Sequence, residues 1–287
     1  VAWPAARAAA ASPPPQPQQA YRCCYSGALQ RGCGPELWGI SLEQLRSLVR
    51  HPRHAAGMST RDVVEAIIKP DTAGAMAGLA LLKNLDRPLR ARVMVCHAWD
   101  SPYSELVAAL ERSGEQGPFW LCATALYQRE DVPALTIDRQ LGLEAGGPIT
   151  AVLSQAEALL CVLSEEPFDI YARLWCLFEI HAAVQLGVEV RVTKRSRGFS
   201  WGVIDELLIS LCEKPVNSRL ARCGPMGCPV NADEQAIRGA IEATPGGHAA
   251  FDAAVEGSRR DALAQGRDLL LGRGWGQTEF GRRYAEA

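Results

Sequence analysis

Apolar residues between positions 90 and 195 follow two alternating patterns. Short runs that are apolar throughout are typical of strands buried on both faces, and segments with helical spacing of apolar positions separate them. The expected strands cover residues 93–96, 119–123, 158–163 and 188–192. Strand and helix therefore alternate four times, which predicts an α/β fold with a parallel sheet covered by helices.

The segments on either side of this core have different patterns. Residues 1–35 are rich in Ala, Pro and Gln and lack an apolar period, so we expect a disordered leader there. Residues 36–89 and 196–287 carry helical apolar spacing. The apolar faces of these helices need covering, so we expect the N-terminal and C-terminal helical regions to fold with the core at residues 90–195.

Polar residues mark the ends of two helices expected in the N-terminal region. Ser41, followed by Gln44 three residues later, suits a capping box. Ser59 or Thr60 is placed to cap the next helix. Pro70 is expected to end that helix, because proline lacks the amide hydrogen that a helix interior needs.

The loops that follow the strands are where a parallel sheet of this kind binds ligands. They cover residues 97–104, 124–131 and 164–169, and the first two contain His97, Trp99 and Arg129. His97 is either a proton carrier or a strand-end histidine satisfied by the backbone. Trp99 either stacks on a ligand ring or packs in the core.

Residues 168–187 predict an amphipathic helix with both ends marked. Asp169 is placed to cap the N-terminus, and Gly187 suits the left-handed residue that follows a helix. Trp175 and Glu179 lie four residues apart and so share one face. A carboxylate one turn after a tryptophan suits a face that lines a cleft better than a buried seam.

Composition excludes several classes of partner. The 287 residues include 30 basic and 32 acidic side chains, so we expect no nucleic-acid partner and no attraction to an anionic membrane. No run of about 18 apolar residues occurs, so we expect no membrane span. The absence of a GxGxxG or GxxxxGKS/T phosphate loop argues against the common nucleotide-binding α/β domains.

Ten cysteines are too few for a disulfide scaffold in a chain of this length. Cys96, Cys122, Cys161 and Cys176 lie in apolar stretches, where a free cysteine behaves as a small hydrophobic residue. This favours a reducing, cytoplasmic location. No cysteine pair has zinc spacing with a convincing second half, so no metal site is expected.

Three pieces of the core together resemble the Toll/interleukin-1 receptor (TIR) domain superfamily in a divergent form. The run VMVC continuing into HAWD is similar to the family's first strand and loop, and FWLCATALYQRED is similar to the second. LLCVLSEEPFDIYARLWCLFEI is similar to the third strand, the Ser-containing loop and the Trp-Cys-x-x-Glu helix. The resemblance covers residues 90–192 and implies a flavodoxin-like parallel sheet.

Some TIR domains cleave NAD⁺ at the nicotinamide–ribose bond, and the resemblance makes Glu179 the candidate catalytic residue. Nicotinamide leaves as a neutral molecule, so one carboxylate near the ribose can stabilise an oxocarbenium-like transition state without a general acid. The implied substrate-binding residues are His97, Trp99, Arg129 and Trp175, with Trp99 stacking on a ring and Arg129 meeting phosphate. NAD⁺ would be the substrate, and no separate cofactor is implied.

Two functions from different classes are therefore open. One is an NAD⁺ hydrolase that acts in signalling when TIR-like domains self-associate, and the other is a TIR-like module that binds protein partners without catalysis. Glu179 in its motif favours the enzyme, although an ion pair with a neighbouring helix would make it structural, with Trp175 packed beneath the site. Cys122 and Ala123, where relatives often carry an acidic residue, favour the interaction module.

Overall fold

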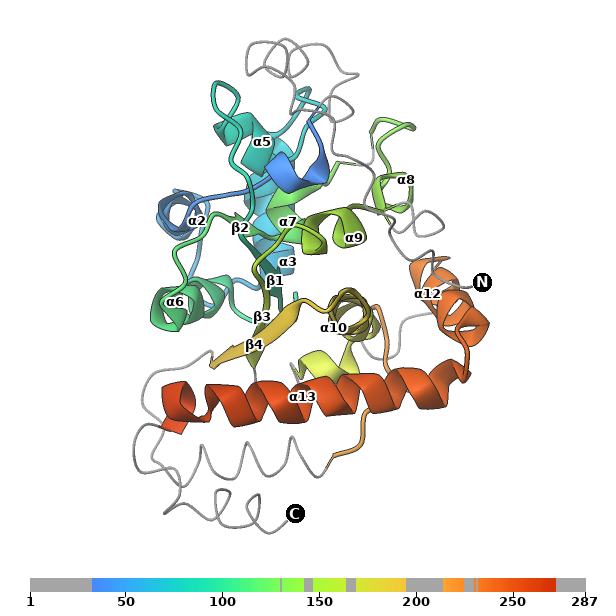
Figure 1. Ribbon diagram of the computed structural model, residues 1–287. Helices are drawn as coiled ribbons and strands as arrows, with labels where there is room; N and C mark the ends of the chain where they lie inside the picture. Colours follow the sequence, from blue (N-terminus) through green and yellow to red (C-terminus); the bar gives the residue numbers. More distant parts are fainter. Residues whose placement is uncertain are drawn as a thin grey trace, which may run out of the picture.

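Residues 33–129, 131–141, 147–163, 169–194, 214–224, 230 and 232–271 are described by the computed structural model of the protein. Four parallel strands form one sheet in the order β2-β1-β3-β4. They are β1 (Val93–Cys96), β2 (Phe119–Trp120), β3 (Ala158–Leu163) and β4 (Glu189–Lys194). Helices cover this sheet (Figure 1), so the predicted α/β architecture with a parallel sheet is confirmed.

Both faces of the sheet are buried. Successive strand residues point to opposite sides. Val93 and Val95 accordingly belong to one apolar cluster, whereas Met94 and Cys96 belong to another. All six residues of β3 are buried. The wholly apolar runs in the sequence therefore reflect a sheet that is covered on each face.

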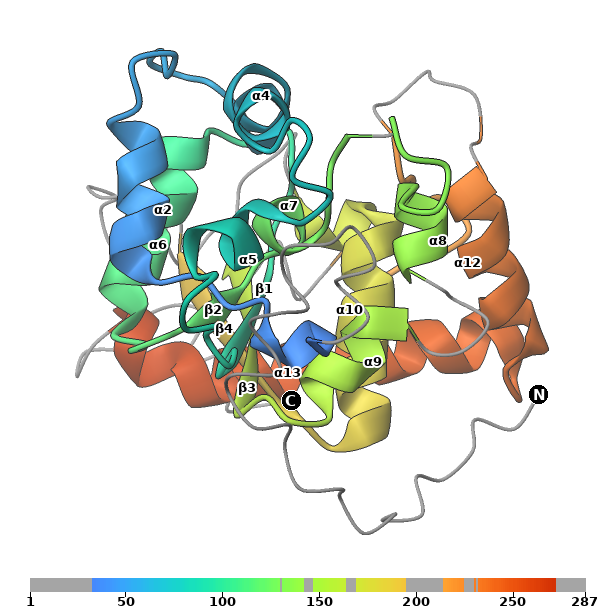
Figure 2. The same cartoon turned by 90° about the horizontal axis from the view of Figure 1, so that it is seen from above.

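The N-terminal region and the helix after β1 cover one face. The helices here are α2 (Leu42–Val49), α3 (Thr60–Val63), the π-helical segment η2 (Val64–Ile68), α4 (Lys69–Asp71) and α6 (Tyr103–Ser113). Figure 2 shows α2 lying beside α6, and the apolar sides of α2, α3, η2 and α6 form one cluster with the sheet. The N-terminal region thus packs directly on the core, as its apolar faces required.

A short N-terminal 3-10 helix and helices from the middle and the C-terminal region cover the other face. They are η1 (Pro35–Leu37), α9 (Gly147–Leu153), η4 (Ile170–Ala172), α10 (Leu174–Leu186), α12 (Ala232–Ala243) and α13 (Gly247–Leu271). The long helix α13 runs past β4 and α10 (Figure 1), and α12 packs on both α10 and α13. Three short helices complete the fold: α5 (Leu79–Lys83), α7 (Cys122–Ala125) and α8 (Ile137–Leu141).

The predicted caps of the two N-terminal helices are confirmed. The Ser41 hydroxyl accepts a hydrogen bond from the Gln44 amide at 3.2 Å, and the Gln44 side chain accepts one from the Ser41 amide at 2.9 Å. Ser59 caps α3 through the same reciprocal arrangement with Asp62. Each box satisfies two amides that a helix N-terminus otherwise leaves unpaired.

Pro70 does not end its helix as predicted. It lies within α4, which continues to Asp71. In the preceding π-helical segment the Lys69 amide donates to the carbonyl of Val64, five residues earlier. The proline ring therefore meets a widened turn, which relieves its clash with the carbonyl four residues before it.

The edges of two strands differ from the expected ones. β2 ends at Trp120 and not at residue 123, because the Leu121 carbonyl accepts hydrogen bonds from the amides of Thr124 and Ala125 and so begins α7. β4 starts one residue late and continues to Lys194, because it pairs with β3 along the whole length of β3. Both ends of β4 are thus set by its pairing with β3 and not by the extent of the apolar run in the sequence.

The segment expected to form one amphipathic helix is divided and more deeply buried. Asp169 caps η4, where its carboxylate accepts a hydrogen bond from the Tyr171 amide at 2.8 Å. α10 begins only after the extended residue Arg173. It is not amphipathic, because α9, α12, α13 and the sheet surround it and bury most of its side chains. Gly187 ends it in the left-handed conformation, as predicted.

Several predictions concern residues outside the described ones. These are the leader apart from residues 33–35, residues 164–168 of the third loop, and residues 196–213, 225–229, 231 and 272–287 of the C-terminal region. None of the helices formed by the described residues has the length and apolar character that crossing a bilayer requires. The cysteines within the described ranges are free thiols.

Replacing Gly187 with Ala is expected to lower the free energy of unfolding by about 1–2 kcal/mol. Gly187 has φ 68°, and an added Cβ would meet nothing within 4 Å, so only backbone strain opposes the change. Gly257→Ala in α13 is the matched control, because Gly257 also has open space but helical backbone, and this variant is expected to gain about 0.5–1 kcal/mol. Urea titration measures both, and equal effects of the two variants would contradict the assignment.

Candidate active site

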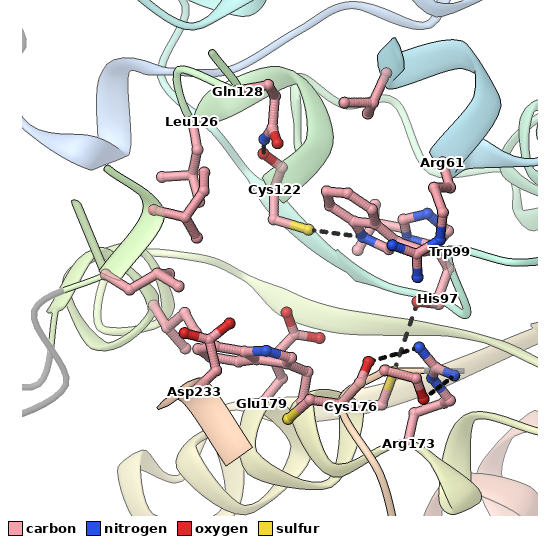
Figure 3. A pocket seen from close by; sticks show the side chains of 18 of the residues that line it. Arg61, His97, Trp99, Cys122, Leu126, Gln128, Arg173, Cys176, Glu179 and Asp233 are labelled. Atoms are coloured by element: carbon pink, nitrogen blue, oxygen red, sulfur yellow. Dashed lines mark hydrogen bonds between the residues drawn. The ribbon is translucent and has the colours of Figure 1, made fainter. Parts of the chain in front are cut away.

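A cavity of about 330 Å³ opens at the carboxyl ends of β1 and β2, beside the first turns of α10. The chain leaves β1 for β2 on one side and later returns past β1 to β3. The crevice at such a reversal is where open parallel sheets bind ligands. Figure 3 shows Arg61, Trp99 and Cys122 facing Asp233, Glu179 and Cys176 across this cavity.

Three regions of the chain line the cavity. The core contributes residues from the loops after β1 and β2 and from α10. The N-terminal region adds Arg61, Val64, Glu65 and Lys69, and the C-terminal region adds Cys223, Gly224 and Asp233. Both flanking regions therefore complete a site whose centre lies in the core at residues 90–195.

Glu179 lies on the cavity wall and is only 6% exposed. Burial removes its carboxylate from water and raises its pKa to about 7, with a hydrogen bond from the Cys96 thiol acting in the opposite direction. Among the described residues no basic side chain forms an ion pair with this carboxylate. The structural role considered above, a pair with a neighbouring helix, is therefore absent from them, and Glu179 is open to a cationic ligand.

Two tryptophans line the cavity, each half-buried. The Nε1 atom of Trp99 donates to the Sγ atom of Cys122 at 3.2 Å, which fixes the ring plane. Trp175 stands edge-on to Phe178, with ring centroids 6.1 Å apart at an interplanar angle of 89°. Each ring keeps surface at the cavity, so both can contact a planar ligand.

His97 lies in the cavity wall as a neutral group. Its Nε2 atom lies 3.1 Å from the Thr60 hydroxyl, so a side chain of α3 takes the place of the backbone partner expected from the sequence. Burial lowers the pKa of His97 to about 3. An imidazole that stays uncharged at neutral pH orients its neighbours, and it does not act there as an imidazolium proton donor.

The start of α3 is bound to the loop that follows β1. The amides of Thr60 and Arg61 donate to the carbonyls of Ser101 and Trp99, each at 3.1 Å. The Arg61 side chain then reaches Asp100, with 3.0 Å between Nε and Oδ1. These contacts bring Arg61 to the cavity and hold the loop that carries Trp99.

Arg173 brings a second guanidinium group to the same edge. Its Nη1 atom lies 3.0 Å from Oδ2 of Asp100, so Arg61 and Arg173 share one carboxylate. Arg173 also donates to the carbonyls of Cys223 at 2.8 Å and Gly224 at 3.2 Å, which fastens the C-terminal segment to the site. Two guanidinium groups against one carboxylate leave positive charge at this edge, which suits phosphate.

Arg129, the predicted phosphate contact, is not among the residues that line the cavity. Its Nε atom pairs with Asp131 at 2.7 Å, and its Nη1 atom lies 3.4 Å from the Lys69 carbonyl. The neighbouring Gln128 lines the cavity and donates to the Cys122 carbonyl at 3.0 Å. Of the sequence-predicted residues, the structure thus brings together Glu179, His97, Trp99 and Trp175, and leaves out Arg129.

Sequence reasoning missed Arg61, Arg173 and Asp233. Arg173 lies two residues before Trp175, so its position beside the Trp-Cys-x-x-Glu motif could have marked it as a candidate site residue. Arg61 and Asp233 lie in the flanking regions, and only tertiary packing brings them to the cavity. No local pattern marks either residue.

The cavity combines a carboxylate that is half ionised near neutral pH, two aromatic rings and two guanidinium groups. Such a set suits a ligand that carries both a cationic aromatic ring and phosphate. Comparison with protein-family models, with curated proteins and with solved structures found no match for this chain. Its function therefore has to be inferred from the cavity and the motif.

Proposed function

We propose that the protein hydrolyses NAD⁺ at the nicotinamide–ribose bond, with Glu179 as the catalytic carboxylate. The observation that carries the proposal is a buried carboxylate, without a basic partner among the described residues, on the wall of a cavity with two tryptophans and two guanidinium groups. The motif that resembles TIR domains supports it. So does the strand order β2-β1-β3-β4, with which the flavodoxin-like order begins.

The positive nicotinamide ring of NAD⁺ is complementary to an ionised Glu179. In a wall of low dielectric, the carboxylate attracts the ring's charge and then the charge that develops on the ribose as the bond breaks. The electron pair of the C1′–N bond leaves with nicotinamide, which becomes neutral and needs no proton. Water bonds to C1′ and its proton passes to Glu179 and then to solvent, which gives ADP-ribose.

The remaining lining groups suit the rest of the substrate. Trp99 or Trp175 stacks on the nicotinamide ring. Arg61 and Arg173 meet the pyrophosphate. The cavity volume of about 330 Å³ lies near the lower end of ligand pockets, which span about 300–1,000 Å³. We therefore expect the cavity to hold the nicotinamide riboside end, with the adenosine end over its opening.

Arg61→Ala is expected to raise KM for NAD⁺ by about tenfold with little change in kcat. The arginine would contact a phosphate that does not change during the reaction, and an interaction made equally in both states affects binding alone. A charged hydrogen bond is worth about 1.5–3 kcal/mol, and partial exposure of Arg61 places the effect at the low end. Arg46→Ala, which removes a guanidinium paired with Glu43 and Glu111 away from the cavity, is the control. An unchanged KM for Arg61→Ala would remove this residue from the substrate site.

Nicotinamide release from NAD⁺ by the purified chain tests the proposed activity. The assay compares dilute protein with protein clustered on a surface, because the resemblance to TIR domains implies that the core self-associates when it acts. Turnover in either condition supports the hydrolase, and turnover only after clustering supports a need for assembly. Intact NAD⁺ in both conditions, with protein that is folded by circular dichroism, overturns the hydrolase and leaves the TIR-like interaction module.

A further inference from the structure

Glu179 also belongs to a group of three buried side chains with metal-binding atoms. The Sγ atoms of Cys96 and Cys176 and a carboxylate oxygen of Glu179 all lie within 4.8 Å of one another. We propose that these three residues bind a thiophilic divalent cation, for which zinc is the best fit. No zinc spacing appears in the sequence because Cys96 and Cys176 lie 80 residues apart and meet only in the fold.

The three ligand atoms are close to the separations that zinc requires. Zinc forms tetrahedral sites with bonds of about 2.3 Å to sulfur and about 2.0–2.2 Å to carboxylate oxygen, so its ligand atoms lie about 3.4–3.8 Å apart. A contraction of about 1 Å from the largest separation therefore suffices. A side-chain torsion that turns by about 30° from its preferred value costs about 0.5–1.5 kcal/mol, which the metal bonds would offset.

The ligands stand on regular secondary structure. Cys96 is the last residue of β1, and Cys176 and Glu179 lie three residues apart on one side of α10. Both thiols make long contacts with carbonyl oxygens, 3.9 Å from Cys96 to Cys176 and 3.5 Å from Cys176 to His97, and the Cys96 thiol also donates to the Glu179 carboxylate. A metal would displace weak hydrogen bonds, because thiols are poor donors.

The cavity supplies a route to the cluster and an open coordination position. Cys176 and Glu179 line the cavity, and Cys96 lies behind them in the buried end of β1. A cation bound by the three residues would therefore face the cavity with its fourth position, where water completes a tetrahedron. His97 is committed to Thr60 and is not one of the three ligands.

Charge balance explains why a cation is needed to ionise this cluster. Two thiolates and one carboxylate carry three negative charges, which a buried site does not tolerate without compensation. A divalent cation leaves one negative charge, next to the guanidinium of Arg173 at the edge of the cavity. Binding releases the two thiol protons, and the proton of Glu179 where it is present, so affinity rises with pH.

The two uses of Glu179 exclude each other. A carboxylate that coordinates zinc cannot also stabilise charge on a ribose, so zinc would inhibit NAD⁺ cleavage. This consequence rests on the proposed function, whereas the binding of the cation does not.

Cobalt and zinc titrations of the full chain test the metal site without any activity assay. The chain is reduced, freed of metal with a chelator and titrated with Co²⁺, whose thiolate bonds give charge-transfer and visible absorption, and Zn²⁺ is then added as a competitor. Mutation of residues that only hydrogen-bond to metal ligands lowers metal affinity by about 10–100-fold. Loss of a ligand itself is a larger change, so Cys96→Ser, Cys176→Ser and Glu179→Gln are each expected to lower the affinity by at least about a hundredfold. Cys161→Ser is the matched control, because Cys161 is buried beside Cys96 in the sheet but is outside the cluster.

Tight binding that all three ligand variants lose and Cys161→Ser retains supports the site. No binding by the wild-type chain overturns it, and so does binding that Cys96→Ser and Cys176→Ser retain, which would place the metal on other cysteines. If a serine variant fails to fold, Glu179→Gln, which keeps both thiols, replaces it, and undiminished binding by Glu179→Gln overturns the site. Absence of NAD⁺ cleavage in metal-free protein overturns the hydrolase alone and leaves the titration valid.

Discussion

Glu179→Gln is expected to slow nicotinamide release from NAD⁺ by about a hundredfold or more. The amide keeps the size and polarity of the side chain but has no negative charge to set against the developing oxocarbenium ion, and single electrostatic contacts of this kind are worth about 10²–10³ in rate. The loss should appear mainly in kcat, because the charge on the ribose develops only in the transition state. Initial rates over a range of NAD⁺ concentrations measure it.

Glu65→Gln is the matched control for that result. Glu65 also lines the cavity, but its side chain is 60% exposed and pairs with Lys69, so its charge is screened. We expect this variant to keep most of the activity. An equal loss of activity in the two variants would show that the rate depends on the overall negative potential of the cavity. Glu179 would then not be the catalytic carboxylate.

The same Glu179→Gln substitution is expected to stabilise the protein at alkaline pH. The pKa of Glu179 rises from 4.5 to about 7 on folding because the carboxylate is desolvated. Folding then favours the protonated form, so the contribution of Glu179 to stability is full below about pH 4.5 and is lost as pH rises to about 7. A pKa difference of about 2.5, at about 1.4 kcal/mol for each pKa unit, corresponds to roughly 3 kcal/mol.

Urea unfolding of the wild type and Glu179→Gln at about pH 5 and about pH 8 measures this linkage. The difference in free energy of unfolding between variant and wild type should move in favour of the variant by up to roughly 3 kcal/mol at the higher pH. Glu65→Gln serves as the control variant here too, because its side chain is 60% exposed. A Glu179→Gln curve parallel to the wild type across this range would mean that the carboxylate is solvated.

The strands at the centre of the fold were predictable from single short segments. β1 and β3 have the expected bounds, because each is a fully apolar run inside more polar sequence. The capping boxes at Ser41 and Ser59 were equally local. The predicted β2 was too long, because the apolar run from Phe119 to Ala123 contains the end of a strand and the start of a helix. The hydrogen bonds that the Leu121 carbonyl accepts place the start of α7 within this run.

The candidate site was predictable only in part. Glu179, Trp175, His97 and Trp99 all line the cavity, because strand ends and one helix face place them at one edge of the sheet. The environment of Glu179 was not predictable, since the packing of α12 and α13 on α10 surrounds a helix that the sequence pattern presented as amphipathic. Tertiary packing also determines which arginine lines the cavity. Arg61 lines it and Arg129 does not, because contacts with the loop after β1 bring α3 to the site.

The pH dependence of nicotinamide release from NAD⁺ tests the central claim most directly. Hydrolysis by an ionised Glu179 predicts that kcat/KM of the wild-type chain rises with pH and levels off above about pH 7. This is the pKa of Glu179 in the folded protein without substrate. Glu179→Gln should show neither the rise nor significant turnover. A rate that is independent of pH through this range, or equal rates in wild type and variant, would contradict the account and separate the cavity carboxylate from NAD⁺ cleavage.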